Sequence, residues 1–409
     1  MSVNRRTFNT GLVAAGVGAA LSPFGILRAQ SSTLKIGVLL PRSGVQALIG
    51  QSCQKGADVA PRLIKEMLGV GIEIMHADTE SSADVARNRA ERLVQEGAHV
   101  LVGAFDSGHT AAIAQVAEQR GIPHIINIAA APQITEQGYK FVFRNFITAP
   151  EIVTQGLSLM GDLFRATNVA PRTAVFMHVN DTFGQAIAKA VSAILPRLTH
   201  LPFRIVDTIS YDPTAKDLSL EVSKAKGSNA DFLMPVCRLN DAIILRREMV
   251  KQRWRPMGVV NPGSPGIYEE QFAKSLGKLA EYCVTNNPWY NPRAELTKTF
   301  GKAFSKAYPK DNLVYHGVNS GFTFEAILIA ADAFRRAQST DARALAEAIR
   351  STDITSRMCL GGPIRFNAKG QVEGTLMAGL QIHNGLPRVI LPETAAEAKP
   401  VFPMPEYRS

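Results

Sequence analysis

Asp106, Ser107 and His109 stand close together in this 409-residue chain, and their side chains are of the types that nucleophilic catalysis combines. A working nucleophile, base and orienting acid normally come from distant segments, however, and these three are too close in sequence to form such a line. The chain has no Gly-x-Ser-x-Gly, His-Glu-x-x-His or Cys-x-x-Cys motif, and its eight histidines lack metal-ligand spacing. We therefore predict a protein that is not an enzyme and needs neither metal nor cofactor.

The same segment is suited to binding an anion. A helix that begins near Thr110 would direct backbone N–H groups and the positive end of its dipole toward a ligand. Ser107 either adds its hydroxyl to such a site or caps the helix. His109 is either an exposed residue at the helix start or a cleft donor that titrates near neutrality.

Regular alternation of apolar strands and helices surrounds this segment. Short apolar runs at 36–40, 71–78 and 100–103 predict strands, and the pattern restarts at 173–177 and continues to 257–260. Such alternation favours parallel sheets covered by helices on both faces. Two successive windings predict an α/β protein of two lobes, each a doubly wound, mostly parallel sheet, with a ligand cleft between them.

The first 29 residues have the pattern of an export signal. Arg5 and Arg6 precede an apolar run rich in Gly and Ala, and Ala29 is a small residue suited to cleavage. With Phe8, the paired arginines resemble a twin-arginine signal, although ordinary signals also carry such pairs. The run is too short to span a bilayer. We predict that residues 1–29 are a signal peptide cleaved after Ala29.

Composition argues against a nucleic-acid partner. Loss of the leader, with its three arginines and no acids, lowers the formal charge from +10 to +7. The remaining basic residues are scattered and do not interleave with aromatic residues, so we expect no nucleic-acid groove. A mild preference for anionic ligands or an anionic membrane surface remains open.

Motifs along the whole mature chain resemble the Leu/Ile/Val-binding family of type I periplasmic solute-binding proteins, which serve ABC importers. The motifs follow the family's order at 34–60, 102–107, 141–145, 180–184 and 361–370. The resemblance implies a monomeric periplasmic protein that captures a small molecule and delivers it to membrane permease subunits of an ABC importer. A ligand-sensing module of a signalling system is the alternative role.

The resemblance also implies discontinuous lobes joined by three hinge crossings, near Ala149, Cys283 and Met358. The expected first lobe is 30–148 plus 286–357, the second is 149–285 plus 358–395, and residues 396–409 form a C-terminal tail. Because neighbouring crossings run side by side in this fold, a Cys283–Cys359 disulfide is expected if their Cα atoms come within about 7 Å. Four separate buried thiols are the alternative.

The ligand-binding residues expected from the resemblance line the cleft from both lobes. Ser107 matches the serine that helps to hold the ligand carboxylate in amino-acid-binding members. Arg238 replaces an aromatic residue, and its guanidinium either pairs with a carboxylate or points into solvent. The full set is Ser43, Gln46, Ile49, Phe105, Asp106, Ser107, His109, Ala129, Ala130, Phe183, Arg238 and Asn261.

Departures from the family pattern bear on the ligand. Ala130 stands where amino-acid binders carry a threonine for the carboxylate, and Ala149 and Val260 or Asn261 stand where they carry acidic partners for the α-ammonium. Burying an ammonium without an acidic partner costs on the order of several kcal/mol. We therefore predict an apolar or aromatic carboxylate as the ligand, with a branched-chain amino acid or an amide as the alternative.

Overall fold

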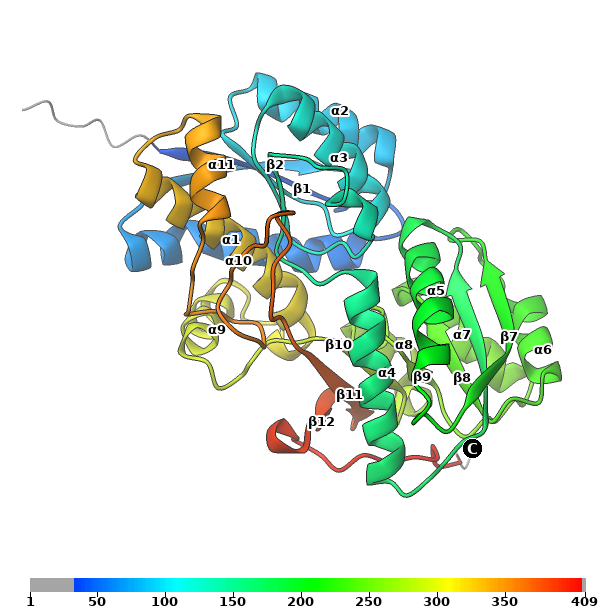
Figure 1. Ribbon diagram of the computed structural model, residues 1–409. Coiled ribbons are helices and arrows are strands. Elements are labelled where there is room, and N and C mark those ends of the chain that lie inside the picture. Colours follow the sequence, from blue (N-terminus) through cyan, green and yellow to red (C-terminus); the bar gives the residue numbers. More distant parts are fainter. Residues whose placement is uncertain (1–32, 407–409) are drawn as a thin grey trace, which may run out of the picture. The chain divides into compact units, whose positions relative to one another are not determined.

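A five-stranded parallel sheet forms the centre of the first lobe in the computed structural model, which describes residues 33–406 (Figure 1). The predicted signal peptide and its cleavage site lie outside the described residues. The strands run in the order β2-β1-β3-β4-β5. Their bounds are β1 Leu34–Leu40, β2 Ile72–Asp78, β3 Val100–Gly103, β4 His124–Ile126 and β5 Val142–Arg144.

Helices cover both faces of this sheet. The central strand β1 directs apolar side chains to each face, and both sets need to be buried. Leu39 packs with residues of α2 and α3, whereas Ile36 and Val38 pack in the core that includes α1 and α10. The helices α1 and α10 cross closely at Gly56, where a Cβ would lie 2.1 Å from the carbonyl oxygen of Ser320. The helices of this lobe are α1 Ala47–Leu68, α2 Ala83–Gln95, α3 Ser107–Arg120, α9 Glu295–Ala307, α10 Leu313–Ala337 and α11 Ala342–Arg350.

The second lobe contains two sheets that meet edge to edge. Parallel strands run in the order β7-β6-β8, and a single bridge between Leu233 and Val259 joins them to the sheet β12-β11-β10-β9. In the second of these sheets, β11 pairs antiparallel with both β10 and β12. The strands are β6 Thr173–Val179, β7 Arg204–Tyr211, β8 Phe232–Val236, β9 Val260–Asn261, β10 Val284–Pro288, β11 Met377–His383 and β12 Leu386–Leu391. Both lobes thus have the α/β architecture predicted from the sequence.

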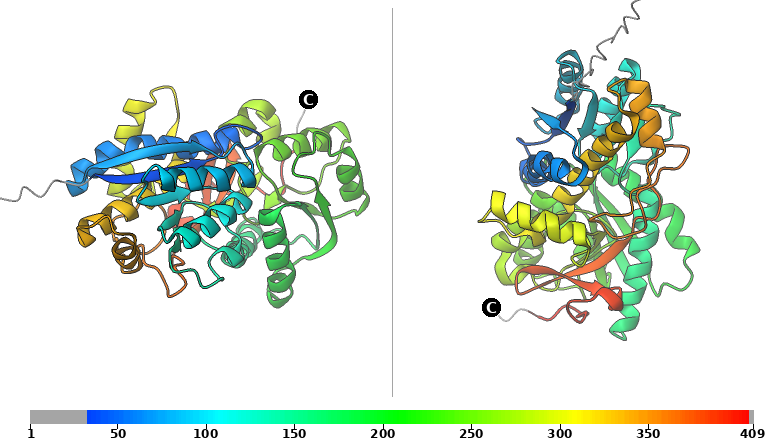
Figure 2. Two further views of the ribbon diagram at one scale, coloured as in Figure 1. Left: turned by 90° about the horizontal axis from the view of Figure 1, so that it is seen from above. Right: turned by 90° about the vertical axis from the view of Figure 1, so that its left-hand side faces the viewer.

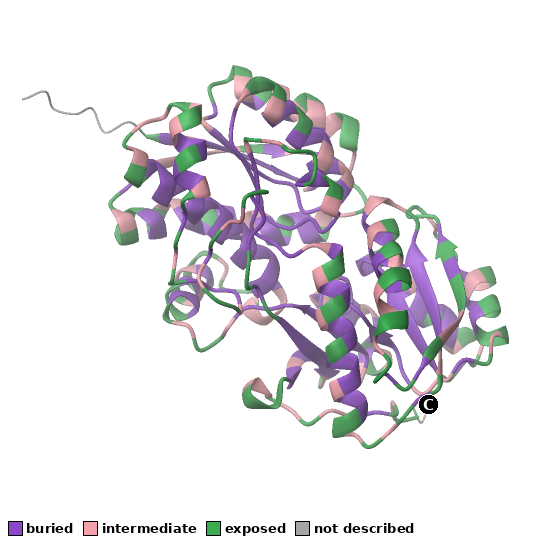
Figure 3. Cartoon of the chain, viewed as in Figure 1, coloured by how far each residue is buried: buried purple, intermediate pink, exposed green. Residues whose placement is uncertain are grey.

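Five helices belong to this lobe, and Figure 2 shows how they flank its strands. They are α4 Ala149–Ala166, α5 Thr182–Ile194, α6 Ser219–Gly227, α7 Leu239–Lys251 and α8 Glu270–Leu276. Most strands are buried, except the edge strand β7, and the outer faces of the helices are exposed (Figure 3). No helix in the described range combines the length and apolar character needed to cross a bilayer.

Three chain segments connect the lobes, and two of them lie later in the sequence than predicted. The first leads from β5 into α4 near Ala149. The predicted boundary at 285/286 is too early, because β10 pairs with β11 as far as Pro288. The boundary at 357/358 is also too early, because Arg144 of β5 still pairs with Gln371. The predicted C-terminal tail docks on the second lobe, where the Phe402 ring lies 5.2 Å from that of Phe164.

The predicted Cys283–Cys359 disulfide is wrong. The second and third crossings do run side by side, but Cys359 pairs with Tyr290, seven residues beyond Cys283. At roughly 3.3 Å per extended residue, that offset far exceeds the reach of a disulfide. All four cysteines, Cys53, Cys237, Cys283 and Cys359, are free and buried.

Candidate ligand-binding site

A cavity lies where loops of the two lobes meet. The first lobe contributes the β3–α3 loop and the segment after β4, and the second lobe contributes α4, α5 and the loop after β9. The lining residues are Phe105, Asp106, Ser107, Ile128, Ala129, Ala130, Phe146, Ile152, Phe183, Arg238, Gly263, Ser264, Pro265, Tyr268, Asn287 and Val318.

Most of the cavity wall is apolar. Phe105 and Phe146 face it from the first lobe and from the first crossing, and Ile152 and Phe183 face it from helices of the second lobe. The helix α4 lies against the loop after β9 because residue 156 is a glycine, where a Cβ would come within 1.7 Å of the carbonyl oxygen of Pro262. A ligand that fills this space is bound chiefly through burial of its own apolar surface.

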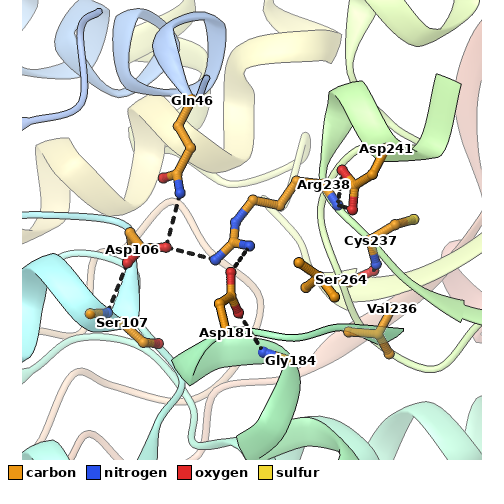
Figure 4. A network of polar contacts seen from close by, with 12 residues as sticks. Gln46, Asp106, Ser107, Asp181, Gly184, Val236, Cys237, Arg238, Asp241 and Ser264 are labelled. Carbon is orange, nitrogen blue, oxygen red and sulfur yellow. Dashed lines mark hydrogen bonds and ion pairs between the residues drawn. The ribbon is translucent and has the colours of Figure 1, made fainter. Parts of the chain in front are cut away.

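Charged groups meet at one side of this cavity and connect the lobes (Figure 4). Arg238, at the start of α7, directs Nη2 to Asp106 Oδ2 at 2.6 Å and pairs through Nη1 with Asp181. Gln46 Nε2 also donates to Asp106 Oδ2, at 3.0 Å. The other oxygen of Asp106 caps α3 by accepting the N–H groups of Gly108 and His109.

Asp106 and Arg238 are both charged at neutral pH. Burial alone would raise the pKa of Asp106, but the charge of Arg238 and the hydrogen bonds from Gln46 and the His109 N–H together hold this pKa below its usual value. Burial alone would lower the pKa of Arg238, and the carboxylates of Asp106 and Asp181 instead raise it. Arg238 is 8% exposed, so the alternative of a solvent-directed side chain is wrong. Its charge is already shared between two carboxylates before any ligand binds.

Ser107 lines the cavity but does not cap the helix, because Asp106 occupies the N-cap position of α3. Its Oγ accepts the N–H groups of Ala130 and Ala131, each at 3.3 Å. Within the described chain no acceptor takes its hydroxyl proton. That proton is therefore available to a ligand acceptor.

The two alternatives for His109 both differ from the structure. The side chain is 5% exposed and does not line the cavity, so it is not an exposed helix-start residue. Burial lowers its pKa below the ordinary value of 6.5, against the pull of Asp106, so the ring is neutral at pH 7. It packs between Asp106 and Thr79, whose Oγ1 lies 3.4 Å from Nδ1.

Four other predicted residues lie near the cavity without lining it. Ser43 is exposed on the loop after β1, and its N–H donates to Asp78. Gln46 acts through Asp106, and Ile49 is buried in α1. Asn261 is buried and shapes the loop after β9 through bonds to Ser264 and Gly263. Whether any of the twelve predicted residues contacts ligand stays a prediction.

Sequence reasoning missed the polar residues that the second lobe brings to the cavity. Ser264, Tyr268 and Asn287 line it, and none was predicted. A signal for Asn287 was present, because it stands near the carboxyl end of β10, parallel to β9. Ligands of such sheets bind beyond the carboxyl ends of their strands. Among residues 33–406 no cluster of His, Cys, Asp or Glu is arranged to hold a metal ion.

A second buried acid lies behind the cavity. Glu269, at the start of α8, is 4% exposed and accepts Asn319 Nδ2 of α10 at 2.9 Å. Burial raises its pKa to about 7, although Asn319 and Lys55 oppose the rise. Glu269, in the second lobe, therefore changes its charge near pH 7 while it is hydrogen-bonded to α10 of the first lobe.

Comparison with known proteins shows which family has this architecture. The family model described as periplasmic binding protein matches residues 33–385. The chain belongs to this family. A periplasmic binding protein of this kind captures a small ligand for an ABC transporter, and the relatives and structural neighbours of this one are substrate-binding proteins rather than enzymes, in agreement with the predicted absence of catalysis. The family assignment implies a periplasmic location.

The relatives bind different ligands. This periplasmic binding protein is 24% identical to "Leu/Ile/Val-binding protein homolog 7" of Brucella suis, over 90% of this chain and 93% of the relative. It resembles the LivJ substrate-binding protein of Streptococcus pneumoniae in complex with isoleucine, with a TM-score of 0.74, 20% identity and coverage of 91% and 100%. It also resembles a solute-binding protein from R. palustris in complex with benzoate. The TM-score is 0.72 and the sequence identity 20%, over 88% of this chain and 96% of that one. At these identities the structural likeness establishes the fold alone.

Proposed function

We propose that this periplasmic binding protein captures an apolar or aromatic carboxylate and delivers it to the permease of an ABC importer. The observation that carries the proposal is that Asp106, the acid in the cavity lining, is already fully hydrogen-bonded within the protein. Both oxygens of Asp106 are engaged, by Arg238 and Gln46 on one side and by the start of α3 on the other. The α-ammonium of a free amino acid would therefore find no available carboxylate among the lining residues.

The apolar body and the carboxylate of the ligand have separate partners in this proposal. Phe105, Phe183 and their aliphatic neighbours bury the body, and the free hydroxyl proton of Ser107 orients the carboxylate. Arg238 offsets the charge of Asp106, which would otherwise repel an anion. The benzoate complex of the R. palustris relative makes an aromatic acid a reasonable first probe.

A thermal-shift screen followed by calorimetry tests the ligand class. A ligand that binds only the native state raises the unfolding temperature. We expect benzoate and related aromatic or branched aliphatic monocarboxylates to raise it, and leucine, isoleucine and leucinamide to leave it unchanged. The matched pair of isocaproate and leucine differs only by the α-ammonium. Tighter binding of leucine than of isocaproate would overturn the proposal in favour of amino acids.

A further inference from the structure

Asn287 presents an unpaired hydrogen-bond acceptor to the cavity, whose wall is mostly apolar. The residue lies at the end of β10, lines the cavity and is 6% exposed. Its Nδ2 donates to the carbonyl oxygen of Ser264 at 3.1 Å and to Thr285 Oγ1 at 2.6 Å. These contacts fix the orientation of the amide, because the opposite flip would place Oδ1 against a carbonyl oxygen.

The remaining oxygen, Oδ1, accepts no hydrogen bond from any residue between 33 and 406. This oxygen is not sealed inside the protein, so it borders open space. Neighbouring hydroxyls do not supply a donor. The Thr285 hydroxyl donates to the carbonyl oxygen of Ser264 at 3.2 Å, the Tyr268 hydroxyl donates to Asn319 Oδ1 at 3.3 Å, and the Ser264 hydroxyl forms no hydrogen bond with Asn287 Oδ1.

An acceptor in this position requires a donor from the cavity. Leaving a buried acceptor unpaired costs about 1–3 kcal/mol, so a ligand without a donor here is disfavoured relative to one that has it. Because the carboxamide is uncharged, a neutral donor suits it better than an ammonium, which requires a carboxylate partner.

We infer that the ligand carries a hydroxyl or amine N–H group on the part of its body that meets Asn287 in the second lobe. This inference rests on the proposed function and extends it, since the carboxylate would be oriented by Ser107 of the first lobe. A ligand with both groups contacts polar side chains of both lobes. A hydroxylated or amino-substituted aromatic carboxylate has this pattern.

Calorimetry with matched ligands tests the inference on the unmodified protein. The probes are benzoate, 3- and 4-hydroxybenzoate, the corresponding aminobenzoates, and 3- and 4-methoxybenzoate. The methyl ethers keep the oxygen attached to the benzene ring but lack the hydroxyl proton. We expect at least one hydroxy or amino compound to bind about tenfold or more tightly than benzoate and than its own ether, the gain typical of a satisfied hydrogen bond.

Two variants assign the preference to a residue. Asn287→Ala should reduce the preference for the hydroxylated probe to near unity while keeping most of the affinity for benzoate. Ser107→Ala, the control, should weaken benzoate and hydroxybenzoate by the same factor and leave the preference intact. Thermal unfolding checks that each variant is folded, and the wild-type comparison stands even if Asn287→Ala is not.

The outcomes separate this inference from the proposed function. Equal binding of benzoate, its hydroxy and amino derivatives and the ethers would overturn the inference and leave the proposed carboxylate ligand in place. A hydroxyl preference that survives in folded Asn287→Ala would also overturn it. Failure of every aromatic and aliphatic carboxylate to bind would overturn the proposed function and, with it, the inference.

Discussion

At the scale of single residues, Arg238 has two roles that bear on the proposed carboxylate ligand. Its guanidinium neutralises Asp106 beside the cavity and also ties the lobes together. These roles predict different consequences when the charge is removed. Loss of neutralisation would weaken anionic ligands alone, whereas loss of the connection between lobes would weaken every ligand.

We predict that Arg238→Gln weakens benzoate by about tenfold or more relative to benzamide, the loss expected when a charge-assisted interaction is removed. Benzamide has nearly the same shape but no charge, so calorimetry with both ligands isolates the electrostatic effect. Asp181→Asn is the matched control, because Asp181 does not line the cavity and the Arg238–Asp106 pair remains. Equal weakening of benzoate and benzamide would show that Arg238 acts only on the connection between the lobes.

The hydroxyl of Ser107 gives a second prediction at this scale. Ser107→Ala removes the donor proposed for the carboxylate, and a hydrogen bond to a charged group contributes about 1.5–3 kcal/mol, so benzoate should bind roughly tenfold or more weakly. Stability should fall by about 1–3 kcal/mol, because the buried N–H groups of Ala130 and Ala131 lose their acceptor, so affinity is compared only after thermal unfolding shows that the variant is folded. Unchanged benzoate affinity in a folded variant would move the carboxylate to another part of the cavity.

At the scale of elements, α4 determines the position of the loop after β9. Gly156→Ala should destabilise the protein by about 1–3 kcal/mol, because its Cβ would overlap the carbonyl oxygen of Pro262 and push the helix away. Ligand affinity should fall as well, since Ile152 and Gly263 border the cavity from these two elements. Denaturant unfolding measures the loss. Gly227→Ala at the end of α6, where no atom lies within 4 Å, is the control and should be neutral.

The elements themselves were largely predictable, whereas their connections were not. Apolar runs and their alternation with helices identified β1, β3 and β6 because buried parallel strands have a distinctive composition. The crossings were placed too early because strand length depends on pairing, and β10 continues to Pro288 through its pairing with β11. The same error placed Cys283 opposite Cys359. Pairing partners of this kind are set by tertiary structure and leave no local signal.

The positions of cavity residues on loops could be predicted from the sequence, whereas their burial and protonation could not. Phe105 and Ser107 follow a strand end and were correctly placed at the cavity. His109 was assigned wrongly because its state is set by burial in the folded lobe, which three neighbouring residues in the sequence do not reveal. Asn287 was overlooked because β10, with the sequence VTNNP, lacks the apolar run that identified the other strands.

At the scale of the whole molecule, ionisation of Glu269 couples stability to pH. The folded pKa of about 7 lies above the ordinary 4.5, so the folded state binds more protons than the unfolded state between these values. Stability contributed by this group is therefore full below about pH 4.5 and is lost as pH rises toward 7. The loss is on the order of 3 kcal/mol.

Glu269→Gln should remove this dependence while keeping an oxygen for Asn319. We expect the variant and the wild type to be similarly stable at pH 5 and the variant to be more stable at pH 8. The difference between the two proteins must be measured, because burial lowers the pKa values of His124 and His316 to about 4, and this gives the opposite slope below pH 6.5. Parallel pH profiles for the two proteins would contradict the assignment.

The four buried thiols leave the molecular surface without a reactive sulfur atom. A maleimide dye would therefore react only with cysteines introduced on purpose. Met67 on α1 and Leu220 on α6 are 38% and 60% exposed and belong to different lobes. Cysteines at these two positions, carrying a donor and an acceptor fluorophore, would report the separation of the lobes in single molecules without prior removal of any native residue.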